Sequence, residues 1–378
     1  MMRVGVIGGG QLAWMMAPEA TKLGISLLVQ TPSTEDPAAA VAETVLAPLR
    51  DAKATAELAA RCDAITFENE FVDLDALGEL EQQGVVFAPS LSVLTPLLDK
   101  YHQRCYLRDI GLPVPEFISW FGDEQSSFLG KWPLVVKARR HGYDGRGTEV
   151  VHNMTELVAV WQRWGKVPVL LEEFIPFERE LAVMAARSRG GEIAIYPVVE
   201  TQQENQVCRR VLVPAAIDPK VAAECETIAR QLLQPQSGPA VVGIFGIELF
   251  LTAQGQLLVN EIAPRTHNSG HFTIDACEIS QFQMQLRAVC DLPLGQTTLK
   301  SPGAVMVNLL GYEHSRDDYR TKRQQLAAIP GAHLHWYGKA ESHPGRKLGH
   351  VTVLLEAPGL AMDIARKVES IWYPDPES

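Results

Sequence analysis

The sequence predicts a mixed α/β and α+β protein of several domains, and three observations support this fold class. Near the start, short apolar strands alternate with helical stretches, which is typical of a parallel sheet. Beyond residue 240, two apolar runs flank a glycine-containing turn, which is typical of an antiparallel hairpin. The chain has 378 residues, of which 46% are hydrophobic and 21% charged, and this is enough for two or three domains with buried cores.

The N-terminal segment carries the alternating pattern. An apolar strand over 4–7 enters the glycine turn Gly8 to Gly10, and apolar residues at helical spacing follow. We expect further strands in ISLLVQ, DAITF and GVVFAP, with helices over 54–61 and 74–82 between them. The pattern predicts a Rossmann-like parallel domain over residues 1–96.

The glycine turn permits three interpretations. Gly8, Gly10 and Ala13 match the dinucleotide fingerprint GxGxxG/A, which would indicate a nicotinamide or flavin enzyme. That fingerprint also needs an acid at the end of the second strand, whereas this strand ends in Gln30 and Thr31. A loop for a phosphate or another small ligand, and a purely structural turn, therefore remain open beside the dinucleotide site.

Charge and cysteine usage limit the class of protein. The formal net charge is −11, from 34 basic and 45 acidic residues, which argues against holding nucleic acid or an anionic membrane by bulk electrostatics. The six cysteines are scattered without a CxxC pair, so we expect neither a zinc ribbon nor a disulfide framework. No apolar run reaches the length of a membrane span and no signal peptide is recognisable. We expect a cytoplasmic chain that begins at Met1.

The segment KARRHGYDGRGTEV, from Lys137 to Val150, follows an apolar strand and combines basic residues with three glycines. Backbone N–H groups of a glycine loop can cradle phosphate oxygens, and nearby lysine or arginine supplies positive charge. The segment does not match GxxxxGK[ST], which excludes an ordinary P-loop. The pattern favours a phosphate site over a merely solvated strand end.

The next candidate is VLLEEFIPFERE, in which an apolar strand runs into Glu172, Glu173, Phe174 and Ile175 before a second strand opens with Glu180. Adenine needs backbone donors and acceptors beside apolar walls, and a carboxylate can accept from ribose hydroxyls. Two ordinary strands with solvated acids are the alternative.

Two glutamates in the hairpin provide the strongest signal. With Gln254 and Gly255 as a two-residue turn, position 253 pairs with 256, and Glu248 then faces Glu261. Like charges directly opposite each other are unfavourable, and a divalent cation bound by both would remove the conflict. We predict a magnesium site there, with Asn260 as a neutral neighbour; exposed acids in a shifted register are the alternative.

Two later segments also carry candidate binding residues. The loop APRTHNSGH gathers Arg265, His267, Asn268 and Ser269, and its histidine spacing fits no common zinc site, so we prefer substrate binding. Towards the C-terminus, Lys339, Arg346 and Lys347 surround a turn between two apparent strands, which favours either a phosphate monoester site or a solvated hairpin.

Long motifs in a fixed order now carry a resemblance. GYDGRG, NEIAPRTHNSGH, MVNLLG, HLHWYGK and PGRKLGH resemble the 5-(carboxyamino)imidazole ribonucleotide synthase family of the ATP-grasp superfamily, from GGGQL near the start to PGRKLGH near the end. The resemblance implies an ATP-grasp fold with a pre-ATP-grasp domain over 1–96, an ATP-grasp domain over 97–298 with a lid at roughly 115–190, and a small β-rich domain over 299–378.

The resemblance implies an activity as well. MgATP would phosphorylate bicarbonate, and the carboxyphosphate, directly or through carbon dioxide, would carboxylate the exocyclic amine of aminoimidazole ribonucleotide in purine biosynthesis. The implied cofactors are ATP and Mg²⁺, and members of the family are usually homodimers. The rival readings are another ATP-grasp ligase, which should lack HLHWY and PGRKLGH, and a non-enzymatic nucleotide sensor, which would not need the metal carboxylates.

Site residues carried over from the family fall into four groups. The nucleotide would contact Lys100, Lys137, His141, Gly142, Tyr143, Gly145, Gly147, Glu172, Glu173, Phe174, Ile175, Glu180, Gln203 and Asn260. Magnesium would bind Glu248 and Glu261. The ribonucleotide would contact Gln11, Tyr143, Asp144, Gly145, Arg146, Asn268, Ser269, Lys339, Arg346 and Lys347. Catalysis would involve Arg265, His267, Asp144 and Arg146.

Three positions depart from the family pattern. Ala13 replaces the last glycine of the first turn, which a helix start tolerates. Phe71 stands where histidine is common in the segment TFENEFVD, which leaves the roles of Glu68 and Glu70 open. Gln203 stands where a nucleotide-contacting histidine would be, which puts that contact in doubt.

Overall fold

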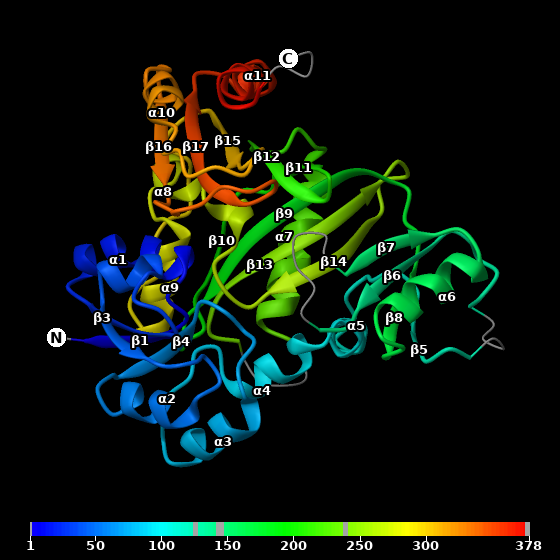
Figure 1. Ribbon diagram of the computed structural model, residues 1–378, viewed down its shortest axis with the longest axis horizontal. Helices are drawn as coiled ribbons and strands as arrows, with labels where there is room; N and C mark the ends of the chain where they lie inside the picture. Colours follow the sequence, from blue (N-terminus) through cyan, green and yellow to red (C-terminus); the bar gives the residue numbers. More distant parts are fainter. Residues whose placement is uncertain (1, 124–127, 141–146, 237–240, 375–378) are drawn as a thin grey trace.

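The computed structural model describes residues 2–123, 128–140, 147–236 and 241–374. Figure 1 shows the N-terminal part in blue, the long central strands in green, a smaller group of strands on the side away from the N-terminus, and the C-terminal elements in orange and red. The α-helices are α1 (Gln11–Leu23), α2 (Ala52–Ala59), α3 (Leu74–Gln82), α4 (Leu91–Leu94), α5 (Lys100–Asp109), α6 (Met154–Arg163), α7 (Pro219–Leu233), α8 (Thr273–Ala276), α9 (Gln281–Val289), α10 (Arg320–Ala327) and α11 (Ala361–Trp372).

The strands form three sheets. They are β1 (Arg3–Ile7), β2 (Ser26–Thr31), β3 (Glu43–Leu46), β4 (Ala64–Phe67), β5 (Phe117–Trp120), β6 (Leu134–Ala138), β7 (Thr148–Val151), β8 (Val169–Glu173), β9 (Phe177–Arg187), β10 (Ile193–Ile195), β11 (Val199–Glu204), β12 (Val207–Val213), β13 (Gly243–Thr252), β14 (Leu257–Ala263), β15 (Gly303–Leu310), β16 (Ala332–Trp336) and β17 (Lys347–Leu355). None of the described helices combines the length and the apolar composition that a bilayer crossing needs.

The N-terminal sheet is parallel, as the alternating pattern predicted, with the order β3-β2-β1-β4. The strand expected in GVVFAP is wrong, because that segment makes only an isolated bridge between Phe87 and Ile65. Pro89 follows two residues later and has no N–H to donate, so the ladder cannot continue there. The missed strand is β3, whose short and half-polar sequence ETVL carries a weak strand signal.

The central sheet has nine strands, in the order β14-β13-β9-β11-β12-β15-β17-β16, with β10 paired to β9. The hairpin β13–β14 therefore forms one edge, and the C-terminal strands β15 to β17 extend the same sheet rather than forming a separate one. One continuous sheet thus connects the paired glutamates to the basic C-terminal turn that precedes β17.

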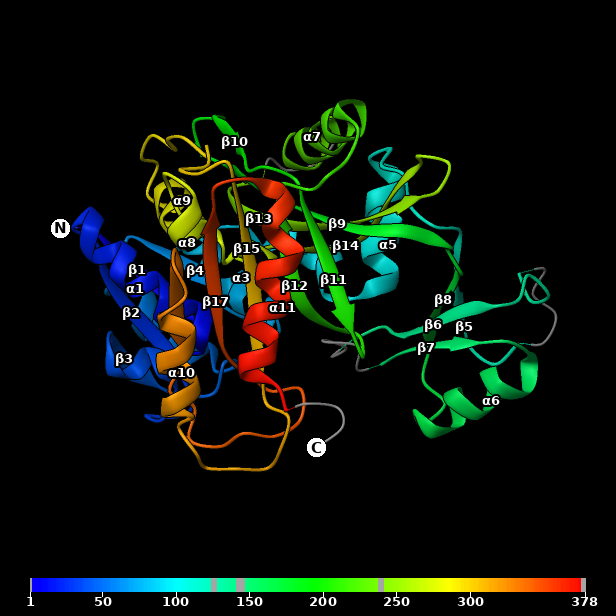
Figure 2. The same cartoon turned by 90° about the horizontal axis from the view of Figure 1, so that it is seen from above.

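The small sheet has the order β5-β8-β6-β7 and is covered by α6. Figure 2 shows these elements set apart from the central sheet, beyond the ends of β9 and β14. Lys137 lies on β6 and Glu172 on β8, so the small sheet carries two of the predicted nucleotide residues.

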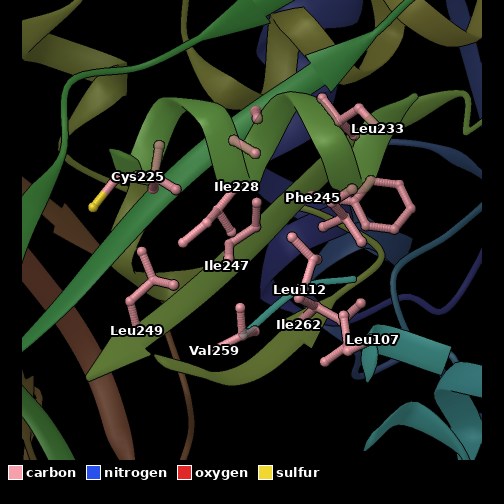
Figure 3. Packing of buried hydrophobic residues seen from close by; sticks show 14 of the residues in the cluster. Leu107, Leu112, Cys225, Ile228, Leu233, Phe245, Ile247, Leu249, Val259 and Ile262 are labelled. Carbon is pink, nitrogen blue, oxygen red and sulfur yellow. The ribbon is translucent and has the colours of Figure 1, made fainter. Parts of the chain in front are cut away.

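A buried cluster fixes the hairpin to the helices behind it. Figure 3 shows Ile228 of α7 and Leu107 of α5 packed with Phe245, Ile247 and Ile262 of the hairpin strands. Burial of each such side chain contributes about 2 kcal/mol. The hairpin strands are therefore held against α5 and α7 on one face.

Candidate active site

A cavity of about 2470 Å³ opens between the three sheets. Its walls include the glycine turn before α1, the ends of β6 and β8, the hairpin β13–β14 and the basic turn before β17. Residues from far apart in the sequence therefore meet around one space.

Glu248 and Glu261 face each other across β13 and β14, which confirms the predicted pairing. The turn is different from the prediction, because Thr252 N donates to Gln256 O at 3.0 Å and Gly255 adopts a φ of 79° in a three-residue loop. This loop shifts the register by one residue, so that Leu249 pairs with Val259. A bulge at Asn260 restores the opposition of the two glutamates.

The two paired carboxylates differ in their electrostatics. Burial, together with the neighbouring carboxylates of Glu261 and Glu180, raises the pKa of Glu248 to about 7. Burial also acts on Glu261, but Lys100, with Lys137 and Arg104, outweighs burial and lowers the pKa of that carboxyl. Lys100 Nζ lies 2.9 Å from Glu261 Oε2.

Lys137 lies at the same end of the cavity and is buried. Its Nζ donates to Asn260 Oδ1 at 3.1 Å and lies 2.6 Å from Glu172 Oε2. Lys100, Lys137, Asn260 and the two hairpin glutamates thus form one group of alternating charge, as a site for a phosphate with a cation requires.

Glu172 is almost fully buried, between Arg104 and Lys137. Burial alone would raise its pKa, but the two cations outweigh burial and lower the pKa to about 2. Its carboxylate is therefore paired with Lys137 and Arg104, and the predicted contact of Glu172 with the nucleotide stays a prediction.

The segment that follows β8 lines the cavity with Glu173, Phe174 and Ile175. Glu173 accepts from the backbone N–H of Glu116 at 2.9 Å. Glu180 also lines the cavity, where burial raises its pKa to about 7 against a hydrogen bond from Gln203. The structure therefore brings Gln203 to the carboxylate of Glu180.

Arg265 lies in the cavity wall and is paired with Glu70. Its Nε donates to Glu70 Oε2 at 2.6 Å and its Nη2 to Glu70 Oε1 at 3.4 Å, a bidentate arrangement that fixes the guanidinium plane. Glu68, two residues earlier, accepts from the backbone N–H of Leu12 at 3.4 Å. Glu68 and Glu70, whose roles the sequence left open, thus connect Arg265 to the first turn of α1.

The glycine turn is closed around Glu68. A Cβ on Gly10 would lie 2.5 Å from Glu68 Oε1, and a Cβ on Gly8, which has a φ of 117°, would lie 2.5 Å from Glu68 Oε2. The end of the second strand, β2, carries no acid for a ribose, and Gln30 there is buried and donates to Pro48 O at 2.8 Å. The geometry disfavours the dinucleotide interpretation.

His267 lies beside the acid pair. Its Nδ1 accepts from the backbone N–H of Ser269 at 3.4 Å, which leaves the proton on Nε2, and Nε2 lies 3.5 Å from Glu248 Oε1. His267 lines the cavity, whereas Ser269 is 1% exposed and is not part of its lining.

Asn268 borders the cavity, but its side chain is engaged elsewhere. It donates to Asn308 Oδ1 at 3.0 Å and accepts from Asn308 Nδ2 at 2.8 Å. Asn308 is fully buried and also donates to Cys208 O at 2.9 Å. Asn268, predicted to contact substrate, therefore holds the loop in place with these bonds, whereas Ser269 donates its backbone N–H to His267 Nδ1.

At the other end of the cavity, Lys339 Nζ donates to Gln11 Oε1 at 3.3 Å. Arg346, in the same basic turn, also lines the cavity, and its Nη1 donates to Glu341 O at 3.0 Å. Lys347 lines the cavity as well, and its positive charge opposes the rise in the pKa of Glu248. Gln11, at the start of α1, and the basic C-terminal turn are thus neighbours although 328 positions separate Gln11 from Lys339.

The predicted residues His141, Gly142, Tyr143, Asp144, Gly145 and Arg146 lie outside the described residues. Gly147, the next residue, is described and has a φ of 78°, in the left-handed region that favours glycine. Arg139, at the start of the same segment, pairs with Asp99 through Nε at 2.8 Å. That arginine anchors the segment to the N-cap of α5, which is Asp99.

Comparison with known proteins decides the family. The chain is 55% identical to the N5-carboxyaminoimidazole ribonucleotide synthase of Synechococcus elongatus over 99% of this chain and 96% of that one. The chain belongs to the N5-carboxyaminoimidazole ribonucleotide synthase family. Its segments match the ribonucleotide synthetase preATP-grasp domain (1–95), the ATP-grasp domain (106–282) and the phosphoribosylaminoimidazole carboxylase C-terminal domain (304–361).

Solved structures of N5-carboxyaminoimidazole ribonucleotide synthases share the fold. The enzyme of Thermotoga maritima superposes with a TM-score of 0.86 at 40% identity, covering 98% of each chain. The enzyme of Aspergillus clavatus, in complex with ADP and 5-aminoimidazole ribonucleotide, superposes with a TM-score of 0.89 at 30% identity, covering 98% of each chain. The predicted ATP-grasp fold, with its N-terminal and C-terminal domains, is confirmed.

A second cluster of ionisable groups lies outside the lining of the cavity. Ligand atoms of Asp275, His335 and His350 lie within 4.8 Å of one another. The rings of His335 and His350 stack at 4.5 Å with an angle of 13° between them, so their in-plane lone pairs do not converge on one ion. Asp275 Oδ2 lies 2.8 Å from His335 Nε2, and this arrangement favours a hydrogen-bonded packing cluster over a metal site.

The sequence interpretation missed Arg104 as part of the site and left the role of Glu70 open. Arg104 follows Lys100 by four positions, so helical spacing could have placed it on the same face. The motif TFENEFVD drew attention to Glu70, but no local signal indicated its partner, because Arg265 lies 195 positions away.

Proposed function

We propose that this chain carboxylates 5-aminoimidazole ribonucleotide with bicarbonate at the expense of ATP, and forms N5-carboxyaminoimidazole ribonucleotide, ADP and phosphate. The single observation that carries the proposal is the cavity, which has paired acids and lysines at one end and Gln11, Lys339 and Arg346 at the other. A nucleoside triphosphate bound at one end and a second phosphorylated substrate bound at the other can therefore meet in this cavity. The family and the complex of the Aspergillus clavatus enzyme support the assignment.

For the first half-reaction, we propose that Lys100 and Lys137 bind ATP phosphates. Bicarbonate oxygen attacks the γ-phosphorus, the bond to the β-phosphate oxygen breaks, and ADP and carboxyphosphate result. Both reactants are anions, so cations around the transferred group lower the barrier. The segment from Glu172 to Ile175 would border the base, and Glu180 would accept from the ribose.

Glu248 and Glu261, with Asn260 beside them, fit a magnesium ion. The fit rests on the two opposed carboxylates and the raised pKa of Glu248, because a hard cation between them would remove the repulsion. Bound magnesium would neutralise charge on the phosphates of ATP.

For the second half-reaction, we propose that Arg265 and His267 lie against the bicarbonate-derived carboxyl group. The exocyclic amine attacks the carboxyl carbon, directly or after release of carbon dioxide, and phosphate leaves. Glu70 fixes the orientation of Arg265, and Lys339, Arg346 and Lys347 would hold the phosphate of the ribonucleotide, with Gln11 beside them. Tyr143, Asp144, Gly145 and Arg146 remain predicted contacts of the imidazole nucleotide.

We also propose domain limits of 1–96, 97–298 and 299–378, with a lid at roughly 115–190. The small sheet supports the lid, since its four strands lie between Phe117 and Glu173. A cytoplasmic location and a homodimer stay predictions based on the family.

Phosphate release from MgATP tests the proposal. Purified protein is assayed with bicarbonate, with and without 5-aminoimidazole ribonucleotide, and with glycinamide ribonucleotide plus formate for comparison. We expect turnover that only 5-aminoimidazole ribonucleotide stimulates. Turnover without that selectivity would move the substrate assignment to another ATP-grasp ligase, and absence of turnover would contradict the enzymatic proposal.

A further inference from the structure

One face of helix α5 is directed at strand β14, which carries Glu261. Four residues at the spacing i, i+3, i+4, i+7 form this face, and they are Lys100, Gln103, Arg104 and Leu107. The first pairs with Glu261, and the last packs in the buried cluster with Val259 and Ile262 (Figure 3). The two central positions bind the backbone of β14.

Strand β14 needs such partners, because it is an edge strand of the central sheet. Gln103 is 4% exposed, and its Nε2 donates to Ile262 O at 3.2 Å while its Oε1 accepts from Ile262 N at 3.1 Å. One amide side chain therefore makes the pair of hydrogen bonds that a residue of a neighbouring antiparallel strand would make.

Arg104 binds the other side of the bulge. Its Nη1 donates to Val259 O at 2.9 Å, and its Nε donates to Glu172 Oε1. The second oxygen of Glu172 lies 2.6 Å from Lys137 Nζ. Arg104 thereby joins the hairpin to the small sheet and, through Glu172, to Lys137.

Val259 and Ile262 are the residues on either side of Asn260 and Glu261. The opposition of Glu248 and Glu261 depends on the bulge at Asn260, and a one-residue slip would turn Glu261 to the other face of the sheet. Gln103 and Arg104 bind the backbone at both ends of the segment that such a slip would move.

We propose that Gln103 and Arg104 are positioning residues for magnesium binding. They hold the bulged strand in the one register that presents Glu261 and Asn260 to the cavity, and Arg104 also orients Lys137. The inference rests on the proposed function, and it goes further by assigning the geometry of the metal carboxylates to two side chains outside the ligand set.

Gln285 provides a matched control for Gln103. It is 1% exposed, accepts from Ile244 N at 2.6 Å on β13 and donates to Thr66 Oγ1 at 2.7 Å. Gln103→Met and Gln285→Met each remove two buried hydrogen bonds from an amide that binds the hairpin backbone. Only the first lies beside the bulge.

The measurement is the calorimetric dissociation constant of ADP for the full-length protein, with Mg²⁺ and with EDTA instead. The ratio of the two constants reports how much magnesium strengthens binding. We expect Gln103→Met to reduce this ratio about tenfold, the size expected from the loss of buried hydrogen bonds. Gln285→Met should keep the wild-type ratio. Both variants should lower the melting temperature of the protein by similar amounts.

An unchanged ratio in Gln103→Met, or an equal fall in both variants, would overturn the inference and leave Gln103 a structural residue. Arg104→Lys is the second variant, which serves if Gln103→Met does not fold. It keeps a cation near Glu172 but loses the bond to Val259 O, so a smaller fall in the ratio is expected, and no fall would also contradict the inference. Wild-type protein that binds no ADP in either condition would overturn the proposed function itself.

Discussion

Glu172 and Glu248 lie in the wall of the same cavity, but the protein shifts the pKa values of their carboxyl groups in opposite directions. Glu172 is held between Arg104 and Lys137, and its pKa falls to about 2. Glu248 faces Glu261 across the hairpin, and its pKa rises to about 7. A carboxylate neutralised by the protein supports the fold, whereas a carboxylate beside like charges indicates a place where a ligand completes the electrostatics.

The largest effect should come from the acid pair. Glu261→Gln removes the charge of one proposed magnesium ligand, and we expect ATP turnover to fall by about a thousandfold. The melting temperature of the ligand-free protein should stay within a few degrees of the wild type. Phosphate release and thermal denaturation measure the two quantities, and a variant that kept its magnesium-dependent turnover would refute the metal assignment.

The neutralised carboxylate should show the reverse pattern. Glu172→Gln leaves Arg104 and Lys137 without their buried counter-charge, which should lower the free energy of unfolding by about 3 kcal/mol. Urea denaturation gives this value. A variant as stable as the wild type would show that the ion pairs of Glu172 do not support the fold, and the comparison with Glu248 would fail.

The basic residues around Lys339 allow a similar test for the second proposed ligand, 5-aminoimidazole ribonucleotide. Lys339→Ala should raise the KM for 5-aminoimidazole ribonucleotide by about thirtyfold, because a hydrogen bond to a charged phosphate is lost. The KM for ATP should change little, since Lys339 lies beside Gln11 and is not one of the lysines that we propose for the ATP phosphates. Initial rates with each substrate varied in turn would decide, and an unchanged KM for the ribonucleotide would remove Lys339 from the phosphate site.

The smallest effect is a pH-dependent gain in stability. The pKa of Glu248 in the folded chain is raised from 4.5 to about 7, so the folded state binds this proton more tightly than the unfolded state. Its contribution to the free energy of unfolding therefore falls as the pH rises from about 4.5 to about 7, and stays lowered above that. Glu248→Gln should abolish this fall and be more stable than the wild type by about 1 kcal/mol at pH 8.

The stability difference between Glu248→Gln and the wild type should disappear near pH 4, where the carboxyl is protonated in both states. Urea denaturation of the nucleotide-free proteins in EDTA at the two pH values checks this. A difference independent of pH would mean that packing, rather than charge, explains the gain.

Local sequence patterns predicted the structural features that are formed by residues close together in the sequence. The parallel N-terminal sheet followed from alternating strands and helices, and the hairpin followed from two apolar runs around a glycine. The opposition of Glu248 and Glu261 was also correct, although two compensating features produced it, a longer turn and a bulge at Asn260. A bulge depends on contacts made by the strand edge, and no local spacing reports those contacts.

Residues whose roles depend on distant partners could not be assigned from the pattern. Arg265 is oriented by Glu70, and Glu172 is paired with Arg104 and Lys137. The side-chain amide of Asn268 makes two hydrogen bonds with that of Asn308. In each pair the partners come from different elements, so their meeting follows from the packing of sheets.

The amino-acid sequence by itself determined the fold class, the family and the residue types of the cavity, because those follow from periodicity and from long ordered motifs. Only the tertiary structure decided which charges are neutralised internally and which are left facing the cavity, since that depends on distances between elements. The nine-stranded sheet, which joins Glu248 to the C-terminal basic turn, could not be read from any local segment. Long-range strand pairing is set by burial and hydrogen bonding across the whole chain, and these are satisfied only once the sheets have packed.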